Sequence, residues 1–270
     1  FCLCLIPYPF PFQLQCLYRH LDFRLECDGI MRKKRTLIYV NTDIQNHEFI
    51  YTGIEFYEFV SFLQNPIKNI LLLKANYMGN NYQKNFELVE GTENVKLLTK
   101  EDVHSYGDFC FVDYSNCENV NRLTDDQIAE VLYMAHMYKP LKSPFFDTLD
   151  NRFSYLAHDD GWFCKLYCRK VGDFLDVLNG KIVSLTTSIT KKDVNNLDTD
   201  IQKELLQLAE KGLLLDFEEL KSDNDELSVN VYFVGKYEDM NKVLNSRKEL
   251  KENALIQKCI KYQAEKWHLV

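Results

Sequence analysis

The chain has 270 residues, of which 46% are hydrophobic and 27% are charged, enough apolar content for one large domain or two modest ones. This composition argues against an intrinsically disordered chain, a collagen-like repeat and a polytopic membrane protein. Lys and Arg number 32 against 40 Asp and Glu, which gives a net charge of −8. Nucleic acid is therefore a disfavoured partner.

The first thirty residues differ in character from the rest. Residues 1–18 carry no charge, but Pro7, Pro9 and Pro11 would break a helix before it could span a membrane. No basic segment precedes this apolar stretch and no small-residue cleavage site follows it, which argues against a signal peptide. We therefore expect residues 1–30 to be an extension outside the native fold, and the functional protein to start at Met31. Residues 31–190 are predicted to form the main α+β domain and residues 191–270 a C-terminal α+β subdomain.

The next elements are predicted to be a hairpin, a helix and a pair of strands. β-branched and aromatic runs at 36–40 and 48–52 flank a turn-rich hexapeptide, a pattern typical of a β-hairpin. Thr52 is expected to cap the helix that follows, which ends at Asn65-Pro66. A strand buried on both faces is predicted for 68–77, with 86–90 as its partner.

Two capping boxes follow. Thr99 begins a weak one, which predicts a short helix ending at Gly107, and residues 108–114 form the next strand. Thr124 begins a clearer one, with Gln three residues later, and predicts a helix from Asp125 to Lys139. The expected buried stripe of that helix comprises Ile128, Val131, Leu132, Ala135 and Tyr138.

The clearest local signal is a hairpin of two aromatic-rich strands, 152–157 and 162–168, joined by His158-Asp159-Asp160-Gly161. A helix over 172–178 and a polar linker over 186–198 are predicted next.

Beyond the linker we expect a helix from Asp198 to Lys211, two strands and a helix over 236–252. The two strands are predicted at 213–220 and 227–234, and a closing hairpin at 256–262 and 267–270. Because hairpins replace regular βαβ units, the expected fold class is α+β, with antiparallel hairpins and packed amphipathic helices.

Charge is segregated in the last quarter of the chain. Residues 216–226 hold six acidic residues and one basic residue, whereas residues 242–266 hold seven basic and three acidic residues. We expect these segments to form two solvated faces that attract one another within the fold.

Of the nine cysteines, four lie in the first 27 residues and five are scattered through the remainder. No pair has the C-x-x-C spacing of a zinc or redox site, and this usage favours a reducing cytosol over a disulfide scaffold. Cys164 and Cys168 would share one face of a strand, but two thiols alone do not make a metal site. The sequence predicts no bound metal.

The segments 51–59, 70–74, 106–113 and above all Tyr155-Leu-Ala-His-Asp-Asp-Gly-Trp162 resemble an uncharacterised family of Firmicute proteins of about 240 residues. The resemblance spans roughly residues 34–270. Some members of that family carry the label oxalate:formate antiporter. An antiporter needs many apolar spans of about twenty residues, and residues 31–270 contain none. The resemblance implies a bacterial, cytoplasmic protein and supplies no catalytic residues.

Candidate chemistry is sparse. His158 lies beside Asp159 and Asp160, and Asp108, Asp113 and Glu118 surround a predicted strand, so either group could supply a general base or a metal ligand. The alternative is that Asp160-Gly161 only makes the turn and that Asp108 and Asp113, at an odd spacing, face opposite sides of their strand.

Glycine-rich phosphate loops, a Walker lysine motif and G-x-S-x-G are all absent from the sequence. The sequence therefore predicts no cofactor.

Aromatic residues make up 13% of the chain and gather in short windows that could be core or a recognition surface. We predict a non-catalytic binding or adaptor module with Tyr57, Tyr155 and Trp162 as contact residues, and another protein as its partner. Neither nucleic acid nor a membrane is expected to bind, and the oligomeric state stays open. The alternative is a small hydrolase-like enzyme that uses carboxylates and His158, so whether the chain is an enzyme also stays open.

Overall fold

The computed structural model describes residues 36–74, 86–100, 108–158, 163–223 and 226–270. Residues 36–270 form one compact unit. Within the described residues, twelve strands form one antiparallel sheet in the order β12-β11-β10-β8-β1-β2-β7-β6-β5-β3-β4, with β9 paired to β10 beside this path. The strands are β1 (Leu37–Asp43), β2 (Glu48–Thr52), β3 (Asn69–Lys74), β4 (Glu87–Glu90), β5 (Phe109–Asp113), β6 (Phe153–His158), β7 (Phe163–Cys168), β8 (Leu213–Asp216), β9 (Lys221–Asp223), β10 (Glu226–Phe233), β11 (Ile256–Gln263) and β12 (Lys266–Leu269).

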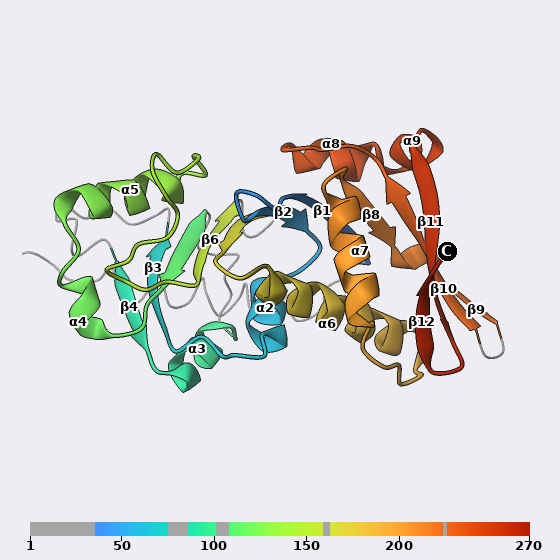
Figure 1. The fold of residues 1–270 in the computed structure, drawn as a ribbon, viewed down its shortest axis with the longest axis horizontal. Helices are drawn as coiled ribbons and strands as arrows, with labels where there is room; N and C mark the ends of the chain where they lie inside the picture. Colours follow the sequence, from blue (N-terminus) through green and yellow to red (C-terminus); the bar gives the residue numbers. More distant parts are fainter. Residues whose placement is uncertain (1–35, 75–85, 101–107, 159–162, 224–225) are drawn as a thin grey trace, which may run out of the picture. The chain divides into compact units, whose positions relative to one another are not determined.

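Helices cover both faces of the sheet, so strand residues of alternate register are buried on either side (Figure 1). On one face lie α2 (Phe56–Phe62), α3 (Thr92–Leu98), α6 (Val171–Thr190) and α7 (Thr199–Ala209). The other face is covered by α5 (Asp125–Ala135) over β5 and β6, and by α8 (Met240–Asn245) and α9 (Arg247–Glu252) over β1 and β8. The short α4 (Cys117–Val120) follows β5.

The fold class is α+β, as predicted, and four hairpin pairings are confirmed: β1–β2, β3–β4, β6–β7 and β11–β12. His158 pairs with Phe163 at the end of β6–β7, which is the register that the predicted turn requires. The turn residues 159–161 themselves lie outside the described residues, as do residues 1–30 and the predicted helix residues 101–107.

One predicted helix start was wrong. Thr52 does not cap a helix, because it still belongs to β2, opposite Tyr39, and the capping box of α2 is made by Glu55 and Glu58. Thr99 is the C-terminal cap of α3, and the helix predicted to follow it lies outside the described residues from residue 101 onwards. Thr52 failed as a cap because it already belongs to the preceding strand.

Helix α6 is longer than the predicted 172–178 segment and runs to Thr190, so the first part of the predicted polar linker is helical. Gly180 lies in its middle, where a Cβ would come within 2.4 Å of the ring of Phe62. The glycine is therefore required for the close approach of α2 to α6 and does not end the helix.

The C-terminal predictions need two further corrections. The predicted strand 213–220 ends at Asp216, after which a 3₁₀ turn, Phe217–Glu219, leads to the short β9. The predicted helix 236–252 is divided into α8 and α9 at Ser246. The predicted boundary after residue 190 coincides with the end of α6. Strands from both sides of this boundary belong to one sheet, because β8 pairs with β1.

Candidate binding surface

The three predicted contact residues occupy different environments. Tyr57 is 42% exposed on α2, and its hydroxyl donates to Glu58 at 3.4 Å. Tyr155 is only 1% exposed, and its ring stacks on Phe111 with centroids 4.8 Å apart. Trp162 lies outside the described residues. Tyr155 is therefore part of the core, and we remove it from the binding hypothesis because no partner could reach it without opening the sheet.

The structure brings two of the candidate catalytic residues together. His158, at the end of β6, and Asp108, just before β5, lie side by side with Nδ1 and Oδ1 3.0 Å apart, and both side chains are partly exposed. Asp113 is at the opposite end of β5, about 16 Å along the strand from Asp108 at roughly 3.3 Å per residue, and it does not join them. Glu118 lies on the exposed α4 and faces Arg122. The hydrolase-like alternative thus has a His–Asp pair, but not the larger carboxylate cluster.

Asp113 is a buried carboxyl at the junction of β5 and β6. Its Oδ1 accepts the backbone N–H groups of Arg152 and Phe153 at 2.9 and 2.6 Å. Burial raises its pKa to about 7, in spite of these hydrogen bonds and the nearby positive charge of Arg152. The guanidinium of Arg152 meanwhile contacts Asp173 of α6 at 3.3 Å. These contacts fix the start of β6 against β5 and α6, which is a structural role.

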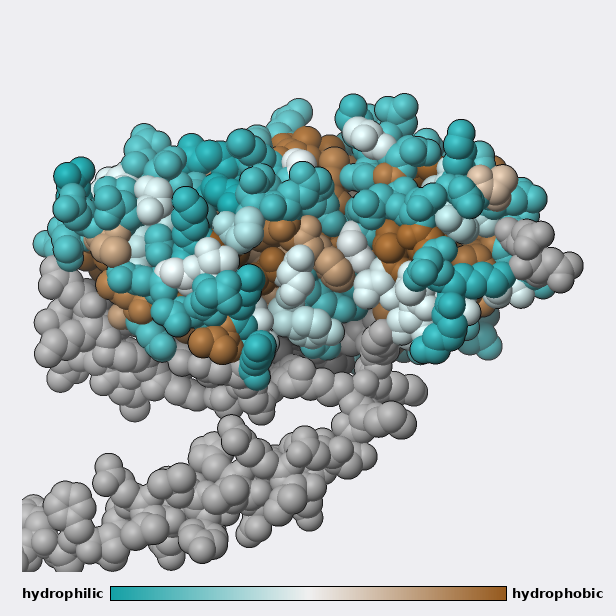
Figure 2. Space-filling model, turned by 90° about the horizontal axis from the view of Figure 1, so that it is seen from below, coloured by the Kyte–Doolittle hydropathy of each residue, from teal (hydrophilic) through white to brown (hydrophobic). Residues whose placement is uncertain are grey.

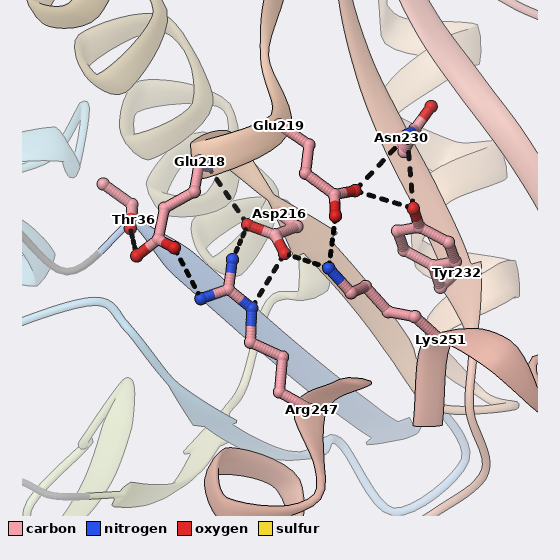
Figure 3. Close-up of polar contacts among 8 residues, drawn as sticks. All are labelled: Thr36, Asp216, Glu218, Glu219, Asn230, Tyr232, Arg247 and Lys251. Atoms are coloured by element: carbon pink, nitrogen blue, oxygen red, sulfur yellow. Dashed lines mark hydrogen bonds and ion pairs between the residues drawn. The ribbon is translucent and has the colours of Figure 1, made fainter. Parts of the chain in front are cut away.

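A second charged cluster joins β8 to α9 and confirms the predicted attraction between the acidic and basic segments (Figure 3). The prediction that both faces are solvated was wrong at Asp216, which is buried. Asp216, fully buried, accepts hydrogen bonds from the Arg247 guanidinium and from Lys251, whose Nζ lies 2.9 Å from Oδ2. Glu218 pairs with Arg247, and Glu219 pairs with Lys251. Tyr232 donates to Glu219 at 2.8 Å.

Every charged group of that cluster has an opposite charge beside it. Burial raises the pKa of Asp216, but hydrogen bonds from Arg247 and Lys251 outweigh burial and hold the pKa below its ordinary value. These contacts lock α9 onto the sheet, and with three carboxylates against two cations the cluster keeps one net negative charge.

The five cysteines in the described part of the chain are free thiols. Cys164 and Cys168 share one face of β7, as predicted, and both contribute to the core cluster beneath α6. Within the same described ranges no group of three or more His, Cys, Asp or Glu side chains could hold a metal ion.

The surface that stands out lies at the C-terminal end of α5, which was predicted to continue to Lys139. The helix ends at Ala135, with His136 as its cap, and Met137 adopts a left-handed conformation with φ of 64°. Tyr138, predicted to lie on the buried stripe, is instead 53% exposed. The prediction failed because it placed Tyr138 on a helical face that the chain has already left.

The reversal at Met137 folds Tyr138 back onto α5. Its ring stacks on that of Tyr133 with centroids 4.7 Å apart and planes 21° apart. In a continuous helix residues five apart point about 140° away from each other, so this stacking depends on the turn. Leu141, 68% exposed, follows two residues after Lys139. We refer to Tyr133, Tyr138 and Leu141 as the tyrosine surface.

Hydrogen bonds and ion pairs hold the tyrosine surface in place. Lys165, on the sheet below, donates to the carbonyl of Met137 at 2.9 Å. Lys142 pairs with Glu130 of α5 at 3.3 Å, which ties the far end of the turn back to the helix. Burial lowers the pKa of Lys165, while attraction to Glu48 and Glu238 opposes the shift. The two tyrosines are thus presented by a segment anchored at both ends.

Sequence reasoning missed Tyr133 and Leu141. Tyr133 lies outside the apolar stripe of its helix, and such a position reads as ordinary surface. An available signal was the run of eleven residues 136–146, which contains two Lys and one His and no acidic residue in a chain of net charge −8.

In the view from below, apolar side chains reach the surface in several areas among hydrophilic ones (Figure 2). Other exposed apolar side chains include the neighbours Leu255 and Ile256. No helix within the described residues is long and apolar enough to cross a membrane.

No family model matches the chain, and neither the curated proteins nor the solved structures contain a match.

Proposed function

We propose that the chain is a non-catalytic binding or adaptor module of the bacterial cytoplasm, and that the tyrosine surface is its contact site for another protein. The observation that carries this proposal is the stacked, exposed pair Tyr133–Tyr138 on an anchored turn. We also propose that the chain is related to the uncharacterised Firmicute family that it resembles.

Tyrosine is favoured at protein interfaces because its ring covers a large area and loses little side-chain entropy on binding. Stacking and the anchored turn have already fixed the two rings, so a partner would not have to order them. Single exposed aromatic residues, such as Tyr57 on α2, are common on protein surfaces and need no such explanation.

The hydrolase-like alternative rests on the His158–Asp108 pair. A histidine beside a carboxylate can act as a general base, but the same pair equally stabilises the pairing of the neighbouring strands β5 and β6. The binding proposal is favoured because the tyrosine surface has both exposure and preorganisation.

The test is a selection of displayed random peptides against the full chain. Selected peptides should bind the wild type in solution and lose about 30-fold in affinity, or more, to a Tyr133→Ser, Tyr138→Ser double variant, since interface anchors cost about 2 kcal/mol when truncated. Tyr57→Ser is the matched control, because that tyrosine is similarly exposed on another helix.

Circular dichroism must show that each variant melts like the wild type. If no peptide is selected, or if the selected peptides bind the double variant as tightly as the wild type, the proposal is refuted. If Tyr57→Ser alone abolishes binding, the contact site lies on α2 instead.

A further inference from the structure

The charges around the tyrosine surface indicate what kind of partner it takes, an inference that rests on the proposed function. Lys139 is exposed next to Tyr138, and Lys142 follows Leu141 with its side chain 74% exposed. The ring of His136 lies 6.4 Å from that of Tyr138. The apolar centre of the surface is thus bordered by basic side chains.

Three acidic residues lie near these cations. Glu130 is 14% exposed and faces Lys142, while Glu48 and Glu238 lie towards the partly buried Lys165. Lys139 is also close enough to Lys165 for the two positive charges to repel each other, which lowers the pKa of Lys165. Lys139, exposed beside Tyr138, has no ion pair among the described residues, so it is the cation that this border leaves for a partner, although the chain as a whole carries a net charge of −8.

We propose that the tyrosine surface binds an acidic peptide segment carrying an aromatic or aliphatic side chain. The apolar side chain packs on Tyr133, Tyr138 and Leu141, and carboxylates of the segment face Lys139 and Lys142. Many protein interfaces have an apolar centre and a rim whose charges are opposite in sign on the two partners. The rim charges steer association and select the partner.

Tyrosines beside lysines also suit single-stranded nucleic acid, whose bases stack on aromatic rings. Nucleic-acid affinity, however, comes largely from neutralised phosphates, and this surface offers few cations on a strongly acidic chain. The acidic peptide is therefore favoured.

The test measures fluorescence anisotropy of three labelled synthetic peptides with the full chain. The first alternates Asp and Glu with a central Trp, the second replaces the acids by Asn and Gln, and the third keeps the acids and replaces Trp by Gly. The first should bind, and the other two should bind at least about tenfold more weakly. Added salt should weaken binding of the first peptide.

Two variants test the basic border. Lys139→Glu should lower the affinity for the first peptide by about tenfold. Lys203→Glu changes the net charge equally but lies on α7, on the other face of the sheet, and should leave the affinity within about twofold of the wild type. Melting curves confirm that both variants fold.

The outcomes separate this inference from the proposed function. If the neutral peptide binds as well as the acidic one, or if Lys139→Glu has no more effect than Lys203→Glu, the acidic partner is refuted while the tyrosine surface stands. If a labelled single-stranded oligonucleotide binds more tightly than the first peptide, the partner is a nucleic acid. If binding of the first peptide is unaffected by Tyr133→Ser and Tyr138→Ser, both proposals fail.

Discussion

Asp113 and Asp216 are each the last residue of a strand, and each is buried, yet their pKa values are shifted in opposite directions. Asp113 ends β5 and accepts backbone N–H groups, which offer partial charges only. Asp216 ends β8 and is met by two cationic side chains from the far end of the chain (Figure 3). The comparison shows that burial raises the pKa of a carboxyl group, and that hydrogen bonds from two cationic side chains reverse the shift.

The difference predicts opposite pH dependence. The folded-state pKa of Asp216 is lowered, so its contribution to stability is present above its ordinary pKa and is lost as the pH falls through the folded value. The folded-state pKa of Asp113 is raised from 3.8 to about 7, so its contribution is present at low pH and is lost as the pH rises towards 7.

The largest effect is expected for Asp216→Asn. The amide can still accept hydrogen bonds, but Arg247 and Lys251 lose their buried negative partner, so we expect the free energy of unfolding to fall by about 3 kcal/mol. Urea denaturation at neutral pH measures this. A loss below about 1 kcal/mol would mean that Glu218 and Glu219 suffice for the two cations.

An effect of at most the same size, in the opposite pH direction, is expected for Asp113→Asn. The amide oxygen can accept the same two backbone N–H groups without ever becoming charged. Between about pH 4 and pH 7 the wild type should lose about 3 kcal/mol more of its free energy of unfolding than the variant does. Urea denaturation across this pH range is the measurement, and parallel pH profiles for the two proteins would contradict a raised pKa at Asp113.

The smallest effect is expected for Glu226→Gln, in the same acidic segment as Asp216. Glu226 pairs with Lys261 at 2.8 Å, but both side chains are more than a third exposed. Exposed pairs contribute little because water already solvates both charges. The urea midpoint should stay that of the wild type, and a shift comparable to that of Asp216→Asn would show that burial does not distinguish the two pairs.

Much of the fold could be predicted from local sequence. Thr124 and Gln127 identify the start of α5, because a capping box needs only neighbouring residues. The alternating aromatic strands around residues 152–168 identify the β6–β7 hairpin for the same reason. Even the pairing of the acidic and basic segments was predictable, since charge complementarity is visible in composition.

The candidate site was far less predictable. Tyr155 and Tyr57 look alike in sequence, each within an aromatic window, but one stacks in the core and the other faces solvent. Tyr138 falls on the correct helical spacing for burial, and only the left-handed residue Met137 takes it to the surface. The conformation of that turn is held by Lys165, a residue from a distant strand.

The sequence by itself determined the class of fold, the hairpins and the acidic character of the chain, because strand periodicity, capping and net charge are local or additive properties. Tertiary structure alone decided in which direction the pKa of each buried carboxyl group is shifted, which tyrosines are exposed and how far α6 extends. Each of these depends on what a distant segment places beside the residue: Arg247 beside Asp216, Lys165 beneath Met137, and Phe62 against Gly180.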